Sequence, residues 1–241
     1  MKFNNVFIFI LFVLVGCATT YNNAFTSYYK SAVSQEELIE YFDNSESDLK
    51  VYKVDDIQKD MLKIVKRGYD IIGESSFIGK TDASLVRVTA TAIGANVVLL
   101  SVKYRNTESG TNTIYLPTFD NTPSKKYDVS YNKDKYEYRA LFFKKIKPLT
   151  LGIIHAPIPA EITTLIKRNR GVMVQIVFDE SPAFFADLVV GDVIIAINDK
   201  NINNGVELNR LLQLNKGQKT QFTIIRSGQT TPEDIFINLN D

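Results

Sequence analysis

The chain has 241 residues, of which 45% are hydrophobic and 23% are charged, as in an ordinary folded protein. This length allows one or two domains after processing. The formal net charge is +1 and Lys and Arg form no long block, so the composition gives no case for binding nucleic acid.

Residues 1–17 have the pattern of a targeting segment. Lys2 supplies a positive charge, and Val6–Val15 is an apolar run that is shorter than the roughly twenty residues a helix needs to span a bilayer. Leu14-Val15-Gly16-Cys17 resembles the lipobox of bacterial lipoproteins, and Cys17 is the one cysteine of the chain. The resemblance implies that Cys17 receives a lipid that holds the protein on a membrane. A plain secretory signal with a chance cysteine and a short membrane anchor are the alternatives.

Residue 18 is alanine rather than the aspartate that marks retention in the inner membrane. By the rule of the lipoprotein family, we expect an outer-membrane lipoprotein that faces the periplasm. Residues 18–47 are predicted as a polar tether followed by a short helix. Ser34 and Glu37 form a capping-box pattern at the start of that helix.

Residues 48–147 predict a small α+β module with about five strands and two helices. A strand is expected over 49–54, a helix from Asp55 or Asp56 to Gly68, a short strand over 69–73 and a loop over 75–79. A helix over 82–93 precedes an apolar strand over 96–104. A weaker strand over 111–116 and a strand over 136–146 flank a long polar stretch, 117–135. This tyrosine-rich stretch is interpreted as a loop, either solvated or a contact surface.

Residues 148–241 contain a second set of elements. An alternating strand over 172–177 is broken at 179–182, where Ser181 and Pro182 suit a helix start. A short helix over 183–188, a turn at 191–192 and an apolar strand over 193–197 follow. Leu208, Leu211 and Leu212 make residues 206–214 an amphipathic helix. Two further strands, over 220–226 and 235–239, complete the pattern.

This order of elements resembles the PDZ domains of bacterial periplasmic proteases of the high-temperature-requirement type, without their protease domain. The resemblance implies a partly open β-barrel with two helices that binds protein C-termini or extended peptides. Asp187 replaces a glycine that is common in the family, and aspartate tolerates the left-handed backbone expected there. The predicted peptide-binding residues are those of the carboxylate-binding loop, the adjoining strand and the helix: Thr150, Leu151, Gly152, Ile153, Ile154, Leu208, Leu211 and Leu212.

Catalytic chemistry is not predicted. His155 is the one histidine, and a Ser-His-Asp protease needs a base, a nucleophile and an oxyanion hole together. No metal site, phosphate-binding loop or other cofactor site is expected, and carboxylate pairs such as Asp55-Asp56 are interpreted as structural. A Ser-Lys dyad needs no histidine and stays open.

The sequence therefore predicts a lipid-anchored periplasmic adaptor that captures a peptide or a protein's C-terminus by strand addition. Two alternatives remain. One is a PDZ-bearing protease or peptidase with an unrecognised active site. The other is a structural or envelope-sensing lipoprotein whose groove does not bind.

Overall fold

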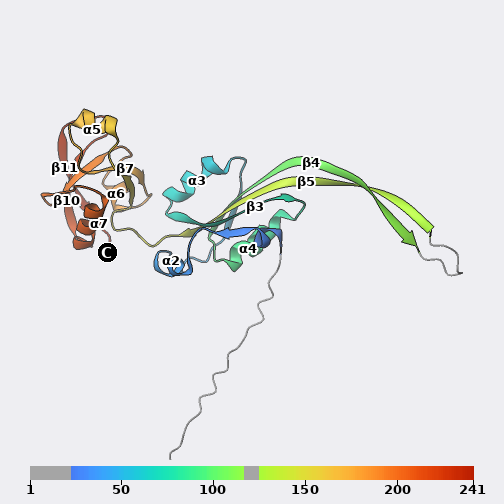
Figure 1. Cartoon of the computed structure of the whole chain (residues 1–241). Helices are drawn as coiled ribbons and strands as arrows, with labels where there is room; N and C mark the ends of the chain where they lie inside the picture. Colours follow the sequence, from blue (N-terminus) through green and yellow to red (C-terminus); the bar gives the residue numbers. More distant parts are fainter. Residues whose placement is uncertain (1–22, 117–124) are drawn as a thin grey trace, which may run out of the picture.

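The computed structural model of the chain describes residues 23–116 and 125–241, so the predicted signal segment and Cys17 lie outside the described residues. Two sheets organise the chain, and both are accompanied by helices, which confirms the α+β class (Figure 1). Within the described ranges, no helix has the length and apolar character needed to cross a membrane.

The first sheet has the strand order β1-β3-β5-β4-β2. All its neighbours are antiparallel except β2 and β4, which run parallel. Its strands are β1 (Tyr29–Ser31), β2 (Lys50–Lys53), β3 (Tyr69–Gly79), β4 (Val97–Leu116) and β5 (Lys125–Lys145).

Helices cover both faces of this sheet, which explains the unbroken apolar run in β4. Val97 and Leu99 pack with residues of α3, whereas Val98 and Leu100 belong to a second core cluster on the other face. Successive strand residues point to opposite faces, so a strand buried on both sides is apolar throughout. The helices are α1 (Ala24–Ser27), α2 (Gln35–Glu40), α3 (Ile57–Lys66), the 3-10 turn η1 (Ala83–Leu85) and α4 (Val86–Ala92).

The predicted tether is wrong for residues 24–31, which form α1 and β1 and are part of the first module. Phe25 is fully buried, and its ring meets Phe77 and Tyr138 edge-on at 5.1 and 5.8 Å. β1 pairs with β3, which extends the sheet at that edge. One aromatic side chain in an otherwise polar segment therefore holds it in the core. The predicted capping box of α2 is confirmed, because Ser34 and Glu37 bond each other's backbone N–H groups.

The predicted loops at 75–79 and 117–135 are also wrong where the structure describes them. β3 runs unbroken to Gly79, with a register shift between Ile71 and Gly73, and β5 begins at Lys125. Residues 106–116 pair with 125–135 in a two-stranded extension of β4 and β5, which we call the arm (Figure 1). The arm begins beyond a register shift between Tyr104 and Asn106. The strand predicted over 111–116 is confirmed as part of β4, whereas its partner over 125–135 was missed, because the described residues of this ribbon have no buried face.

The second sheet has the order β11-β10-β8-β7-β6, with β9 paired to β8. Its strands are β6 (Ile153–Ala156), β7 (Val172–Val177), β8 (Val193–Ile197), β9 (Lys200–Asn201), β10 (Lys219–Ile225) and β11 (Pro232–Asn238). Its helices are α5 (Ala160–Ile166), α6 (Pro182–Phe185) and α7 (Gly205–Leu214).

This domain departs from the prediction in one helix and agrees with it at one unusual turn. Helix α5 was not predicted, and its Ile162 and Ile166 pack against a small cluster around Ile195. Asp187 has φ +54°, so the left-handed backbone expected at that aspartate is confirmed.

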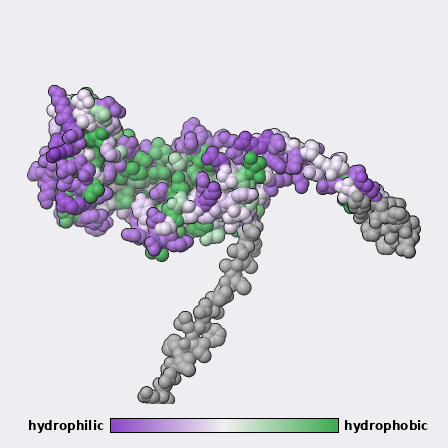
Figure 2. Space-filling view, viewed as in Figure 1, coloured by the Kyte–Doolittle hydropathy of each residue, from purple (hydrophilic) through white to green (hydrophobic). Residues whose placement is uncertain are grey.

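The two parts of the chain are joined through buried contacts as well as through the connecting segment. Phe178, which follows β7, is 7% exposed and belongs to the core cluster of the first module. The next residue, Asp179, donates its backbone N–H to the carbonyl of Lys66 at the end of α3, at 2.7 Å. Figure 2 shows hydrophobic residues gathered over the body of the module and towards this junction.

Candidate functional site

A groove lies between strand β6 and helix α7 and encloses a cavity of about 370 Å³. Seven of the eight predicted binding residues line this cavity: Thr150, Leu151, Gly152, Ile153, Ile154, Leu208 and Leu212. Leu211 does not line it. Its side chain is 1% exposed and packs within the core of the domain instead.

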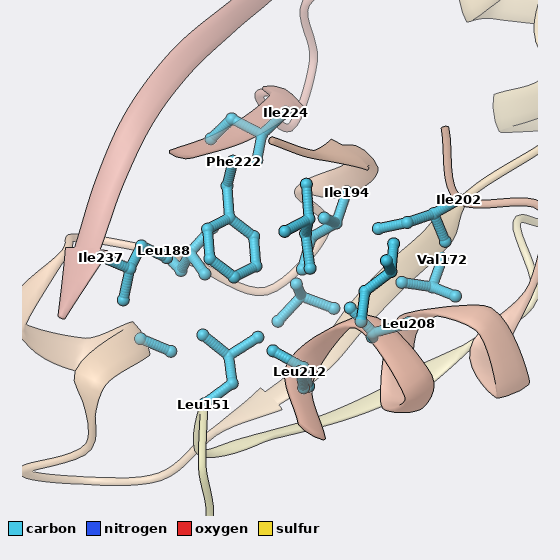
Figure 3. Close-up of a cluster of buried hydrophobic side chains, with 14 of the residues drawn as sticks. Leu151, Val172, Leu188, Ile194, Ile202, Leu208, Leu212, Phe222, Ile224 and Ile237 are labelled. Carbon is cyan, nitrogen blue, oxygen red and sulfur yellow. The ribbon is translucent and has the colours of Figure 1, made fainter. Parts of the chain in front are cut away.

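Helix α7 forms one wall of the groove because of its start signal and its apolar stripe. Asn204 is the N-cap, and its side chain accepts a hydrogen bond from the N–H of Glu207 at 3.1 Å. Leu208 and Leu212 are one turn apart, so they lie on the same face of the helix. Figure 3 shows both beside Leu151, within the buried cluster of the domain.

The loop before β6 turns its carbonyl groups into the protein. The carbonyl of Thr150 accepts from the N–H of Asn240 at 3.0 Å, that of Leu151 from Ala183 at 2.9 Å, and that of Gly152 from Phe178 at 3.0 Å. The N–H groups of Leu151 and Gly152 have no acceptor in the described part of the chain. Both residues are buried and line the cavity. Buried N–H groups without partners are rare, and successive free N–H groups around a glycine form a site for an anion.

Gly152 is required at this turn for two reasons. Its φ of +82° lies in the region that disfavours residues with a side chain. A Cβ at this position would also lie 2.1 Å from the Cβ of Ser181. Ser181 caps α6 by accepting the N–H of Phe184, and its hydroxyl donates to the carbonyl of Phe178 at 2.7 Å. The loop and the start of α6 therefore fit directly against each other.

Strand β6 is the edge strand of its sheet, with β7 on one side only. The backbone groups of its other edge face the groove between β6 and α7. An edge strand of this kind accepts a further strand through main-chain hydrogen bonds. Ile153 packs against the core cluster, whereas Ile154 is 42% exposed.

His155 narrows the groove beside the start of α7. A Cβ on Gly205 would lie 2.4 Å from Cε1 of His155, so the imidazole occupies the space that a side chain at the first helical position would take. His155 also lines the cavity. His155 therefore packs at the edge of the groove.

Further residues that were not predicted also line the cavity. Asn209 and Gln213 lie on α7, each directly after one of the two groove leucines, and they are one helical turn apart. The helical pattern was therefore a signal for them. Tyr41 and Phe178 come from outside the loop, the strand and the helix. Nothing local in the sequence places Tyr41 at this site, because it follows α2 in the first module.

In the described ranges, no three His, Cys, Asp or Glu side chains are grouped to hold an ion. Among the described residues, the groove provides two N–H groups without an acceptor, a strand edge without a partner and an apolar pocket. These are the parts of a site for an extended chain that ends in an anionic group and an apolar side chain.

Comparison with known proteins identifies a family for the part of the second domain that includes α7. Residues 162–235 match the sequence profile of the PDZ domain family, so the chain contains a PDZ domain. A comparison with curated proteins gives no match.

Similar solved structures include the PDZ domain of HtrA3 bound to a phage-derived ligand, FGRWV, with 19% identity and a TM-score of 0.31. That match covers 37% of this chain and 81% of the HtrA3 chain. Another is the HtrA-type protease AlgW with a decapeptide, with 17% identity and a TM-score of 0.32. It covers 53% of this chain, which spans 41% of the AlgW chain.

Proposed function

We propose that the protein is a lipid-anchored adaptor of the bacterial periplasm whose PDZ groove captures the free C-terminus of a peptide or protein. The observation that carries this proposal is a pair of N–H groups, on Leu151 and Gly152, that have no acceptor among the described residues and lie at the end of a groove with an open strand edge. The terminal carboxylate of the ligand accepts hydrogen bonds from these groups, and its backbone adds a strand to β6.

The final side chain of the ligand enters the pocket beside Leu151, Leu208 and Leu212. All three side chains are apolar, and the cavity of about 370 Å³ accommodates one large side chain and the adjoining backbone. An apolar last residue therefore gives the highest affinity, because it exchanges water for an apolar lining. The proposal assigns no chemical reaction to the chain, and the packing of His155 against Gly205 supports that choice.

Peptide binding measured by fluorescence anisotropy tests the groove. Short peptides with an apolar last residue and a free carboxylate are compared with the same peptides amidated at the C-terminus. We expect amidation to weaken binding by at least roughly tenfold, which corresponds to ~1.4 kcal/mol.

A matched pair of variants on α7 locates the binding. Asn209 is exposed and lines the cavity, so Asn209→Trp fills the mouth of the groove and is expected to abolish binding. Val206 is 80% exposed on the same helix and does not line the cavity, so Val206→Trp is expected to leave binding unchanged. Equal affinities for free and amidated peptides, or equal effects of the two variants, contradict the proposed site.

The lipid anchor rests on the lipobox pattern that ends at Cys17. Cell fractionation and palmitate labelling test it. We expect the label in the outer-membrane fraction, and we expect Cys17→Ser to carry no label and to leave that fraction. A labelled Cys17→Ser variant contradicts the assignment of the lipid to this residue.

A further inference from the structure

We propose that the first module forms part of the peptide site, with Tyr41 closing the end of the groove next to the carboxylate loop and contacting the last residue of the ligand. This inference rests on the proposed function of the groove. It assigns a role in specificity to a residue outside the PDZ domain. Tyr41 lines the same cavity as Leu151 and Leu212 and is 40% exposed.

Backbone hydrogen bonds hold Tyr41 beside the loop. Its N–H donates to the carbonyl of Glu37, one turn earlier in α2, and its carbonyl accepts from the N–H of Lys147 at 3.1 Å. The next residue, Phe42, is 1% exposed and bridges antiparallel to Ile146. Residues 41–43 therefore run alongside 145–147, which lead directly into the loop. This pairing fixes Tyr41 at the loop end of the groove, away from His155.

Side-chain contacts fix the direction of the Tyr41 ring. It meets the ring of Phe42 edge-on, with centroids 5.2 Å apart. Lys147 donates its ammonium group to the carbonyls of Ile39 and Glu40, at 3.1 and 2.6 Å, which ties the end of α2 to the segment before the loop. The ring therefore projects from a rigid helix end towards the cavity.

The module cannot swing away from the groove without breaking buried contacts. Phe178 lines the cavity while it also packs in the core cluster of the first module. Its N–H bonds the carbonyl of Gly152, and the next residue bonds Lys66 of α3. The wall made by Tyr41 is consequently a fixed part of the site.

The chemistry of Tyr41 suits the end of a peptide. The ring offers an apolar face to the last side chain, and the phenol offers a hydrogen-bond donor. Burial, and then the negative charge of Asp70, raise the pKa of Tyr41, so the phenol keeps its proton and stays a donor. A side chain at this point leaves room for a ligand that ends at the carboxylate loop and blocks a ligand whose chain continues past it.

Peptide affinities of three variants of the full chain test this role. The probes are short peptides that end in Val or in Phe, each with a free carboxylate. Tyr41→Ala is expected to raise the Kd by roughly tenfold or more. Tyr41→Phe keeps the apolar wall and is expected to have a smaller effect. Ile39→Ala is the matched control, because Ile39 lies on the same helix, is 71% exposed and does not line the cavity.

A fourth variant gives a readout that does not depend on the stability of Tyr41→Ala. Tyr41→Trp makes the wall larger, so it is expected to weaken binding of the Phe-ending peptide more than that of the Val-ending peptide. If Tyr41→Ala binds the peptides as tightly as the wild-type chain does, the inference about Tyr41 is overturned, but the proposed function of the groove is not. If Tyr41→Ala does not fold, an unchanged Phe-to-Val ratio in Tyr41→Trp overturns it. If the wild-type chain binds neither peptide, the proposed function and this inference both fail.

Discussion

Replacing Gly152 with alanine tests the geometry on which the carboxylate loop depends. The backbone of Gly152 has φ +82°, and an added Cβ would lie 2.1 Å from the Cβ of Ser181 and 2.6 Å from its Oγ. A left-handed backbone costs a residue with a side chain ~1–2 kcal/mol. Relieving an overlap in a packed interior costs a further ~1–3 kcal/mol. We therefore expect Gly152→Ala to lower the free energy of unfolding of the PDZ domain by about 2–5 kcal/mol.

Ser181 cannot move aside freely to accommodate the new methyl group. Its hydroxyl donates to the carbonyl of Phe178 and accepts from the N–H of Phe184, which makes it the cap of α6. Loss of such a cap costs ~1 kcal/mol by itself. The cost of the overlap therefore remains whether the loop moves or Ser181 moves.

Urea unfolding, followed by circular dichroism, measures these changes. The double variant Gly152→Ala, Ser181→Gly removes the side chain that the new Cβ meets, and glycine is acceptable as a helix cap. We expect the double variant to be more stable than the sum of the two single changes predicts. A loss below ~1 kcal/mol in Gly152→Ala, or strict additivity in the double variant, would refute the close contact.

Two further predictions concern charged and titratable groups outside the groove. Asp192→Ala is expected to cost ~3–5 kcal/mol in denaturant unfolding, because this fully buried carboxylate accepts from Arg226 at 2.9 Å and from two backbone N–H groups. Glu233→Ala removes the exposed partner of the same arginine and should cost at most ~1 kcal/mol; equal losses contradict the assignment. Burial, and then the hydrogen bond to Glu46, raise the pKa of Tyr69 from 10.0 to about 12. The folded state therefore holds this proton more tightly, and its contribution to stability is present below pH 10.0 and lost as pH rises towards about 12. Tyr69→Phe should make the stability fall less steeply over that range, and an unchanged slope would exclude this cause.

The PDZ domain was predictable from the sequence because its signals are local. Ser181 and Pro182 mark the start of a helix within a few residues, and Asp187 marks a left-handed turn by its own side chain. The same holds for most of the groove, since the loop, β6 and α7 each carry their pattern within a short segment. Leu211 packs in the core instead of lining the cavity, because an apolar helical position does not reveal whether it faces a groove or the core behind it.

The features that were not predicted depend mostly on contacts between residues far apart in the chain. Phe25 converts a polar segment into part of the first module because it fits between Phe77 and Tyr138. Tyr41 reaches the groove because its segment pairs with residues 145–147. Residues 125–135 escaped prediction as a strand for another reason, since polar residues alternate there with Tyr127 and Val129, which both remain 48% exposed. A strand without a buried face lacks the periodic pattern on which such predictions rest.

The continuity of β4 and β5 gives the arm the properties of a lever. Both strands pass from the five-stranded sheet into the arm, and their pairing is continuous except for the register shift near Tyr104. Residues 106–116 cover about 35 Å at ~3.3 Å per residue, roughly the diameter of a small domain. A force applied far out on the arm therefore acts as a torque on the parts of β4 and β5 that lie in the five-stranded sheet. There, the pairing of β5 with β3 and of β4 with β2 resists it. Figure 1 shows the PDZ domain and the arm on opposite sides of the first sheet, so this sheet holds the two apart.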